Sequence, residues 1–442
     1  MNSAHGTYGT PWKEWLAASA ASVTLLLTSA DIIWIDWSIQ ETSDAIANTV
    51  LIIVGAIVGA VSADTFGRKI TLLVTLLFVI PRLLSWFMYP RFVTTCLLFF
   101  GSGVGCAVVP LYISEIAGPS NRAILMVLPL PFYFLEIFAL HISVRVFNFF
   151  TWLSYAKSVV LIGSLFFSGI VLAVFPETPQ YLYWSGRHEE AFRSQDFFRG
   201  IHHGETIKNT VESPSMDPRV TTQVNNATGQ ERFARVSEIM NFENRRSMTM
   251  IFILILFKWA SGFRRNLMIA AVMSANHQYT ITCVIALEII FSACLMLTIN
   301  FFQRKMCLCF VIFMNFVAVL IGLTPIGKIY WLMVGSIFVQ TLGHIVLLAV
   351  TLSYIGSFFP TSIRSLASVI AISFEVLIRN VTSKMDDHMS LAMTIGHPLT
   401  QISNYTFALV LFLGLFVVIM FFPKAKRDSY AEIGDQILEN RE

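Results

Sequence analysis

Residues 51–69 read LIIVGAIVGAVSADTFGRK, an apolar run that ends at Asp64 and is followed by the basic pair Arg68 and Lys69. Extended back to residue 44, the run has the length of a helix that crosses a bilayer, about 20 residues. Bases placed directly after an apolar run favour the cytoplasmic face of a membrane. The stretch therefore predicts a membrane-spanning helix that ends in a charged cytoplasmic loop.

The composition of the whole chain agrees with this interpretation. Only 13% of the 442 residues are charged and 55% are hydrophobic, whereas about 25% charged residues are typical of soluble domains. A water-soluble enzyme would not tolerate so many apolar side chains on its surface. The net charge of +3 is too small to indicate a nucleic-acid partner. We therefore expect lipid to be the solvent for most of the chain.

Twelve apolar runs of suitable length follow one another along the chain. They cover approximately residues 15–35, 44–63, 69–89, 92–112, 122–143, 152–175, 248–268, 279–300, 305–324, 329–351, 364–383 and 400–422. We therefore expect an all-α membrane protein with 12 transmembrane helices in two six-helix bundles. The expected domains are an N-terminal bundle over residues 1–175, a cytoplasmic linker over 176–246 with short helices and a disordered stretch, a C-terminal bundle over 247–423 and a cytoplasmic tail over 424–442.

The basic residues predict the orientation of these spans. Most of the 30 lysines and arginines fall on one side of the membrane if both termini and the linker are placed together there. The bases of the short loops on that side are Arg68, Lys69, Arg122, Arg304, Lys305 and Arg364. Because short loops rich in Lys and Arg stay in the cytoplasm, we expect both termini to be cytoplasmic.

Short patterns recur between the two halves of the chain. DTFGRK at 64–69 matches NFFQRK at 300–305, and Phe-Pro at 175–176 matches Phe-Pro at 422–423. Glu115 and Arg122 are also separated by the same number of residues as Ser357 and Arg364. Each pattern follows the corresponding span of its half. Such a repeat is typical of transporters that are built from two related bundles around a central path.

Four motifs extend this pattern and lie in the same order along the chain. They are GAVSADTFGRK at 59–69, PLYISEIAGP at 110–119, PETPQYLYWSGR at 176–187 and FPTSIR at 359–364. With them the sequence resembles the major facilitator superfamily and, within it, the sugar porters, whose members include glucose transporters and insect trehalose transporters. The organic-ion transporters share several motifs but have a large first outer loop, which this chain lacks. The resemblance implies the major facilitator fold and transport of a small solute by alternating access.

The resemblance also implies a gate of charged residues at the cytoplasmic edge of the membrane. A carboxylate and a facing base attract one another there but lose hydration, so their net stabilisation is modest and reversible. The gating candidates are Asp64, Arg68, Lys69, Glu115, Arg122, Glu177, Arg304, Lys305 and Arg364. The alternative is that these charges only orient the loops.

The second half departs from the motif pattern, since Asn300, Ser357 and Lys424 replace its acidic members. We hypothesise that the acids of the first half serve both sets of bases. Such sharing would leave fewer ion pairs and a looser inner gate.

Sugar porters hold hexoses at mid-membrane with Gln, Asn and Trp, because amides match hydroxyl groups and the indole ring stacks on a sugar face. At the corresponding positions this chain has Leu130 in the fifth span, Lys258 and Arg264 in the seventh, and Glu375 in the eleventh. The substrate-binding candidates are Lys258, Trp259, Ser261, Arg264, Glu375, Tyr133 and Glu136.

The charges among these candidates have two interpretations. Cations on the transport path would favour an anionic or phosphorylated ligand. Alternatively, Lys258 pairs with a carboxylate, for which Glu136, Glu288 and Glu375 are the candidates, and Glu375 has the helical spacing for an ion pair with Arg379. Buried carboxylates can also carry protons, which makes Asp31 and Glu136 candidates for proton coupling.

We therefore expect a carrier and not an enzyme, with no cofactor and no metal. Its expected partners are the lipid bilayer and a small-molecule substrate, and not nucleic acid, while the sequence leaves the oligomeric state open. The substrate that the resemblance implies is a sugar, either a hexose or trehalose, moved by facilitated diffusion in the plasma membrane. The alternatives are a carrier of an organic anion or another non-sugar solute, and a non-transporting sensor that kept the fold.

Overall fold

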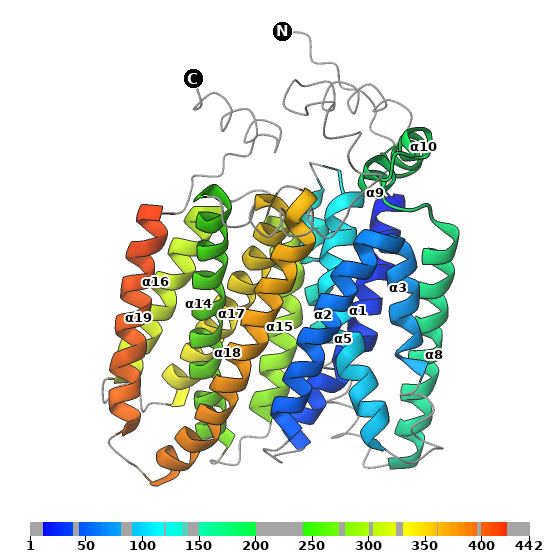
Figure 1. Ribbon diagram of the computed structural model, residues 1–442. Coiled ribbons are helices and arrows are strands. Elements are labelled where there is room, and N and C mark those ends of the chain that lie inside the picture. The colour runs from blue at the N-terminus through cyan, green and yellow to red at the C-terminus, as the bar shows by residue number, and fades with distance from the viewer. Residues whose placement is uncertain are drawn as a thin grey trace, which may run out of the picture.

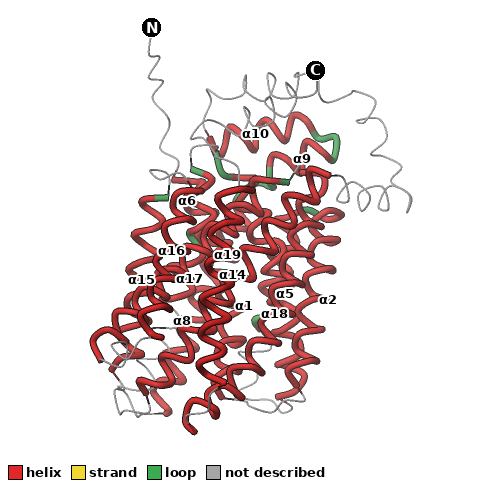
Figure 2. The backbone as a smooth tube through the Cα atoms, turned by 90° about the vertical axis from the view of Figure 1, so that its left-hand side faces the viewer, coloured by secondary structure: helices red, strands yellow, loops and turns green. Residues whose placement is uncertain are grey.

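The computed structural model describes residues 12–38, 44–80, 91–118, 121–135, 138, 150–199, 242–273, 279–299, 304–323, 330–359, 361–395 and 399–421. All of the secondary structure in these ranges is helical (Figure 1). The longer helices run side by side, and the short helices α9 (Pro179–Trp184) and α10 (His188–Arg199) lie across one end of the bundle (Figure 2). We call this end the α9 end.

Each of the twelve predicted spans overlaps a described helix, although α3 and α6 cover only the first part of their spans. In the first half these helices are α1 (Trp12–Ser38), α2 (Asp44–Phe66), α3 (Arg68–Leu77), α5 (Arg91–Ile116), α6 (Arg122–Val127) and α8 (Phe150–Val174). In the second half they are α14 (Phe242–Met273), α15 (Tyr279–Thr298), α16 (Arg304–Leu323), α17 (Tyr330–Phe358), α18 (Thr361–Ile395) and α19 (Leu399–Phe421).

The limits predicted for the linker and the tail stay predictions, although α9 and α10 fall within the range expected to hold short helices. The stretch expected to be disordered, and the tail, lie outside the described residues.

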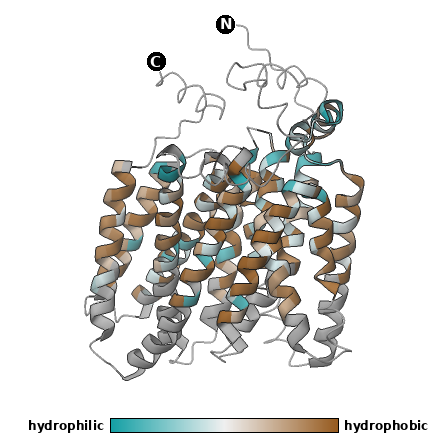
Figure 3. Cartoon of the chain, in the orientation of Figure 1, coloured by the Kyte–Doolittle hydropathy of each residue, from teal (hydrophilic) through white to brown (hydrophobic). Residues whose placement is uncertain are grey.

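Three described segments are long and apolar enough to cross a membrane by length and composition alone. They are Ile46–Phe66, Cys96–Ile116 and Val334–Ile355. Shorter apolar helices accompany them at Arg122–Leu135, Ile162–Val174, Ile285–Thr298, Lys305–Ile321 and Ala408–Met420. Hydrophobic residues cover the body of the bundle, whereas hydrophilic residues gather towards the α9 end (Figure 3).

Helix α2 shows how the sequence orients a helix between lipid and protein. Its large apolar residues Ile46, Val50, Val54 and Val61 are exposed on the outer surface. The small residues of the opposite face, which include Ala56, Ala60 and Ala63, are buried. Small residues let helix backbones approach closely, which is how helices associate in a membrane. Helix α2 therefore packs its small face inward against α5.

Two glycines make the approach of α2 to α5 possible. A Cβ on Gly55 would overlap the carbonyl oxygen of Phe100, and a Cβ on Gly103 would overlap that of Ile52. Only glycine fits these positions without displacing the backbone of the other helix.

Each half has an apolar core, and the core of the first half also takes in Val369 of α18. The first core includes Leu72, Tyr112 and Ile113, and the second includes Ile251, Leu308 and Tyr354. A smaller cluster joins the halves, in which Ala123, Val127, Leu130 and Phe134 pack with Ile299, Ile345 and Ala349. Helix α18 also contacts α2 across the junction of the halves.

Two lysines repeat the same contact in the two halves. Lys69 Nζ donates to the carbonyl oxygen of Ala173 on α8 at 2.9 Å, and Lys305 Nζ donates to that of Ile419 on α19 at 2.8 Å. The lysines begin the third and ninth predicted spans, and the carbonyls lie near the ends of the sixth and twelfth. The contact supports the internal repeat that the motifs predict.

Candidate functional site

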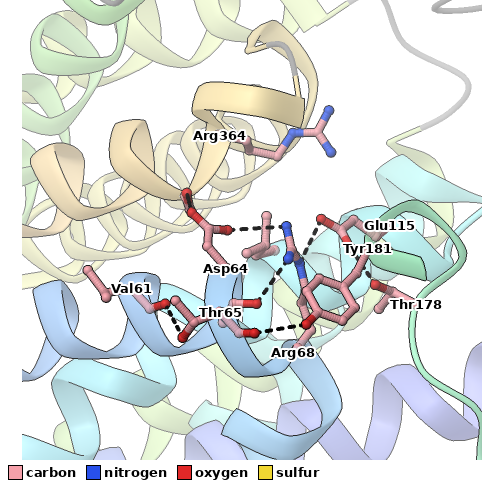
Figure 4. Close-up of polar contacts among 12 residues, drawn as sticks. Val61, Asp64, Thr65, Arg68, Glu115, Thr178, Tyr181 and Arg364 are labelled. Carbon is pink, nitrogen blue, oxygen red and sulfur yellow. Dashed lines mark hydrogen bonds and ion pairs between the residues drawn. The ribbon is translucent and has the colours of Figure 1, made fainter. Parts of the chain in front are cut away.

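Arg68 begins α3 at the α9 end and gathers acidic and aromatic groups around its guanidinium (Figure 4). Its Nε donates to Glu115 Oε1 at 3.1 Å, and one of its terminal nitrogens lies 3.3 Å from Asp64 Oδ1. The other terminal nitrogen donates to the carbonyl oxygen of Ala63 at 2.9 Å, and the guanidinium carbon lies 5.0 Å from the centre of the Tyr181 ring. The Arg68 cluster comprises Asp64, Arg68, Glu115, Thr178 and Tyr181.

Glu115 on α5 is completely buried, with 0% exposure. Its Oε1 accepts the hydrogen bond from Arg68, and its Oε2 accepts one from Thr178 Oγ1 at 2.6 Å. Removing one partner of a buried ion pair costs about 3–5 kcal/mol, because the other charge is left uncompensated. The Arg68 cluster therefore ties α3, α5 and the start of the linker firmly together.

Glu177 lies beside this cluster and caps the N-terminus of α3. Both of its carboxylate oxygens accept from the backbone N–H of Lys69, at 3.0 and 3.1 Å, and Oε1 also accepts from that of Thr178 at 2.9 Å. An anion at a helix N-terminus is favoured by the helix dipole. Burial raises the pKa of Glu177, and the backbone hydrogen bonds and the charge of Arg68 oppose that rise.

Gly67 allows Glu177 to reach this position. Its φ of +104° is in the region that favours glycine. A Cβ at Gly67 would overlap Glu177 Oε2. The shape of the turn therefore depends on the absence of a side chain at this residue.

Two side-chain hydrogen bonds, one buried and one part-buried, join the halves at the α9 end. Ser365 Oγ donates to Asp64 Oδ2 at 2.8 Å, and a terminal nitrogen of Arg364 donates to Ser114 Oγ at 3.3 Å. The donors lie in the first turns of α18, and the acceptors lie near the ends of α2 and α5. Figure 4 shows Arg364 beside the Arg68 cluster. We call these two contacts the cross-half latch.

Our hypothesis that first-half acids serve both sets of bases stays a prediction, although the negative charge of Glu115 does act on Arg364. Arg364 donates to neutral oxygens, those of Ser114 and of the Phe359 carbonyl, the latter at 3.1 and 3.3 Å. The two oxygens of Glu115 accept their hydrogen bonds from Arg68 and Thr178. Ser365 brings the carboxylate of Asp64 into contact with the second half.

The other gating candidates are placed in part. Arg122 begins α6, where its backbone N–H donates to the Gly118 carbonyl at 2.9 Å. Lys69 and Lys305 make the repeated carbonyl contacts described above. The side chain of Arg304 lies outside the described part of the chain, as do those of Asn300, Ser357 and Lys424.

Sequence reasoning missed Glu14, a carboxylate that is only 2% exposed. Its Oε1 accepts from the backbone N–H of Gly118 at 3.2 Å, and its Oε2 accepts from Asn121 Nδ2 at 3.2 Å. Glu14 thus holds the loop between α5 and α6 against α1. The available signal is a carboxylate in the first turn of a helix, before its long apolar run.

Lys258 and Glu375 form an ion pair between α14 and α18 in the second half. The Lys258 ammonium lies 5.0 Å from the centre of the Trp259 ring, and the Lys258 carbonyl contacts His344 Nδ1 at 3.3 Å. The structure therefore selects Glu375 from the three carboxylates considered as partners of Lys258. The side chain of Arg379, the other expected partner of Glu375, lies outside the described residues.

Ser261 lies one helical turn beyond Lys258 and belongs to a buried polar network. Its Oγ contacts Asn315 Oδ1 at 3.1 Å and the Gln340 carbonyl at 3.2 Å. Gln340 Nε2 in turn donates to Ser336 Oγ at 3.3 Å. The network joins α14, α16 and α17. Sequence reasoning missed Asn315 and Gln340, although amides within apolar runs are a usable signal.

The remaining binding candidates divide into two groups. Tyr133 is half-buried beside the cluster that joins the halves, and its ring contacts that of Phe134 edge to face at 5.3 Å. The side chains of Arg264 and Glu136 lie outside the described residues, as does that of Asp31. The structure thus brings Lys258, Trp259 and Glu375 together, and places Tyr133 in a different contact region.

The family model described as "Sugar (and other) transporter" matches residues 36–436 of the chain. The facilitated trehalose transporter Tret1 of Bombyx mori is 22% identical over 448 residues, which cover 94% of this chain and 81% of that protein. The Tret1 protein of Culex quinquefasciatus is 23% identical over 413 residues, which cover 86% of this chain and 74% of that protein.

Solved structures show the same fold. The proton:xylose symporter XylE of the major facilitator superfamily, bound to 6-bromo-6-deoxy-D-glucose, matches with a TM-score of 0.70 at 16% identity, over 96% of this chain and 98% of that one. The inward open conformation of XylE from E. coli matches with a TM-score of 0.60 at 13% identity, with the same coverage of 96% and 98%. The expected all-α fold of two six-helix bundles is confirmed.

Proposed function

The chain belongs to the family of sugar (and other) transporters, and on this basis we propose that it carries a sugar across a membrane by alternating access. It is an integral, multi-pass membrane protein of that family. The mechanism requires two bundles that separate at one end of the central path while they meet at the other.

The cross-half latch is the observation that carries this proposal. Ser365 and Arg364 join the halves at the α9 end through side-chain hydrogen bonds. Most of the apolar core of each half lies within that half, and Val369 of α18 also packs against the first core. The helices inside each half can therefore stay packed together when the latch opens. Two hydrogen bonds are strong enough to favour a closed end and weak enough to break in a transport cycle.

The substrate that we propose is a neutral sugar, a hexose or trehalose, moved by facilitated diffusion. The curated relatives are facilitated trehalose transporters, and a similar solved structure holds a deoxyhexose. The ion pair of Lys258 and Glu375 agrees with a neutral solute because its charges compensate.

The second candidate is a carrier of an organic anion. The buried ammonium of Lys258, only 4% exposed, favours it, because a cation on a transport path attracts anions. Glu375 opposes it by neutralising that cation. We therefore rank the anion carrier below the sugar carrier.

The bases near the α9 end support a cytoplasmic location for that end and for both termini. Arg68, Lys69 and Arg364 lie there, and Arg245 and Arg246 lie in the first turn of α14. We propose the plasma membrane as the site of action, with lipid and a small solute as the partners. Transport of this kind proceeds by movement of the halves and needs no covalent chemistry.

Uptake by purified protein in liposomes tests the proposal. We expect labelled glucose or trehalose to enter faster than into protein-free liposomes, and labelled glucuronate to enter no faster. Uptake of glucuronate alone would select the anion carrier. Uptake of none of the three by folded protein would select the sensor that kept the fold.

A further inference from the structure

A buried ion pair lies midway along the second half of the protein. Counted at 1.5 Å per residue along each helix, Lys258 lies roughly 18 Å from Arg246, and Glu375 lies roughly 17 Å from Arg364. Both arginines belong to the α9 ends of their helices. Half of the hydrocarbon thickness of a bilayer is about 15 Å. The pair therefore lies near the midplane, where ionised side chains are costly and mark transport paths.

The two partners are unequally buried. The side chain of Lys258 is 5% exposed, whereas that of Glu375 is 31% exposed. Lys258 is enclosed by its partner and by the Trp259 ring, 5.0 Å from its ammonium. Glu375 holds Lys258 through Oε1, and its exposed fraction of 31% leaves the carboxylate accessible from outside the pair. The carboxylate can therefore accept a hydrogen bond from a ligand while it still holds Lys258.

The faces of α18 show where this carboxylate points. Leu377 and Val381 are 51% and 57% exposed, and at about 100° per residue they lie on the side of the helix opposite Glu375. Ile372 and Val376, on the flank, pack against residues of α2 and α5 in the first half. Glu375 thus points away from the lipid-facing side of α18, between the face that meets the first half and the face that meets α14.

We propose that Glu375 and Lys258 form a hydroxyl-binding site that selects uncharged, polyhydroxylated solutes, in which Glu375 touches the ligand and Lys258 neutralises and positions Glu375. The proposal rests on the proposed function, since it names the part of the sugar carrier that recognises the substrate. An ionised carboxylate accepts a hydroxyl hydrogen bond about twice as strong as a neutral acceptor does. A sugar acid would bring a second negative charge next to Glu375 and would be rejected.

Charge-changing variants of the full chain in liposomes test this site. The probes are D-glucose and D-glucuronate, which differ in that a carboxylate replaces one hydroxymethyl group. In Glu375→Gln the Lys258 cation is uncompensated, so we expect glucose uptake to fall about tenfold, as for loss of one charge-assisted hydrogen bond, and glucuronate uptake to appear. The double variant Lys258→Gln/Glu375→Gln is neutral again, so we expect it to reject glucuronate.

The matched control is Glu189→Gln, the same substitution on α10, where the side chain is 91% exposed. We expect it to behave as wild type with both probes. Circular dichroism and thermal unfolding identify any variant that fails to fold, and the double variant keeps the test available if Glu375→Gln alone is unstable.

Wild-type protein that takes up glucuronate as fast as glucose would overturn the proposed site, and so would Glu375→Gln with an unchanged ratio of the two rates. Wild-type protein that moves neither probe contradicts the proposed function instead. In that case the unfolding temperature of the wild type would be measured with each probe. An increase with glucose but not with glucuronate, and no such increase in Glu375→Gln, would support the binding site without the transport function. If the wild type moved neither probe and its unfolding temperature did not change with glucose, both proposals would be overturned.

Discussion

Replacing Ser365 with alanine removes one of the two hydrogen bonds of the cross-half latch. Ser365 Oγ donates to the carboxylate of Asp64 at 2.8 Å, and the remaining bond joins Arg364 to Ser114 at 3.3 Å. A hydrogen bond to an ionised group stabilises by about 1.5–3 kcal/mol. Since about 1.4 kcal/mol is a tenfold change in an equilibrium constant, we expect Ser365→Ala to shift the balance from closed to open at the α9 end by about ten- to a hundredfold.

Distances between a spin label on α10, which packs against α1 of the first half, and one on α14 of the second half measure this shift. Glu190 on α10 and Arg245 on α14 are exposed, so labels there leave the latch intact. We expect the longer-distance population to increase in Ser365→Ala. Ser365→Thr keeps a hydroxyl donor, so we expect it to remain nearer to wild type.

Ser368→Ala is the matched control. Ser368 is a buried serine on the same helix, and its Oγ donates to the Arg364 carbonyl within α18 at 2.9 Å. We expect it to leave the distance distribution unchanged. If Ser365→Ala and Ser368→Ala both matched the wild type, the bond to Asp64 would not hold the end closed, and the reasoning would be refuted.

Three further substitutions test the packing and the charges around the two sites. We expect Gly67→Ala to lower stability by about 1–3 kcal/mol, because φ is +104° and the new Cβ would overlap Glu177 Oε2. We expect Gly343→Ala to cost a similar amount, about 1–3 kcal/mol, because its Cβ would overlap Asn315 Nδ2. Gly163→Ala is the control for both in thermal unfolding, since a Cβ there meets nothing within 4 Å, and an equal loss of stability in the control would contradict both predictions. Finally, burial raises the pKa of Glu177 above its ordinary value of 4.5. The folded state therefore binds the Glu177 proton more tightly than the unfolded state does, and the stability that this proton adds is fully present below pH 4.5 and is lost as pH rises. Relative to Glu177→Gln, the wild type should therefore lose stability as pH is raised from 4.5 towards neutrality; a difference in unfolding temperature that is constant with pH would contradict this.

The helices and the Arg68 cluster were largely predictable from the sequence. An apolar run of bilayer length has few alternatives to a helix, because lipid leaves backbone groups no other hydrogen-bond partners. The motif residues Asp64, Arg68 and Glu115 also meet as expected, since each lies at the end of a helix on the same side of the bundle.

The partners within each site were less predictable, because they depend on contacts between distant helices. The sequence offered three carboxylates for Lys258, and only the packing of α14 against α18 selects Glu375. Ser365 has no charge to mark it, although it binds Asp64 across the halves. The charge pattern also gave no sign of Thr178, whose hydroxyl donates to the second oxygen of Glu115.

Counterflow in liposomes tests the central claim most directly. Vesicles that contain the purified chain are loaded with unlabelled glucose and diluted into a trace of labelled glucose. A carrier with alternating access exchanges inner for outer sugar, so the account predicts that the label accumulates transiently above its equilibrium level, and does so more slowly in Glu375→Gln. The account would be contradicted if the label inside the vesicles never exceeded its level in protein-free vesicles, in the experiment with glucose and in the same experiment with trehalose.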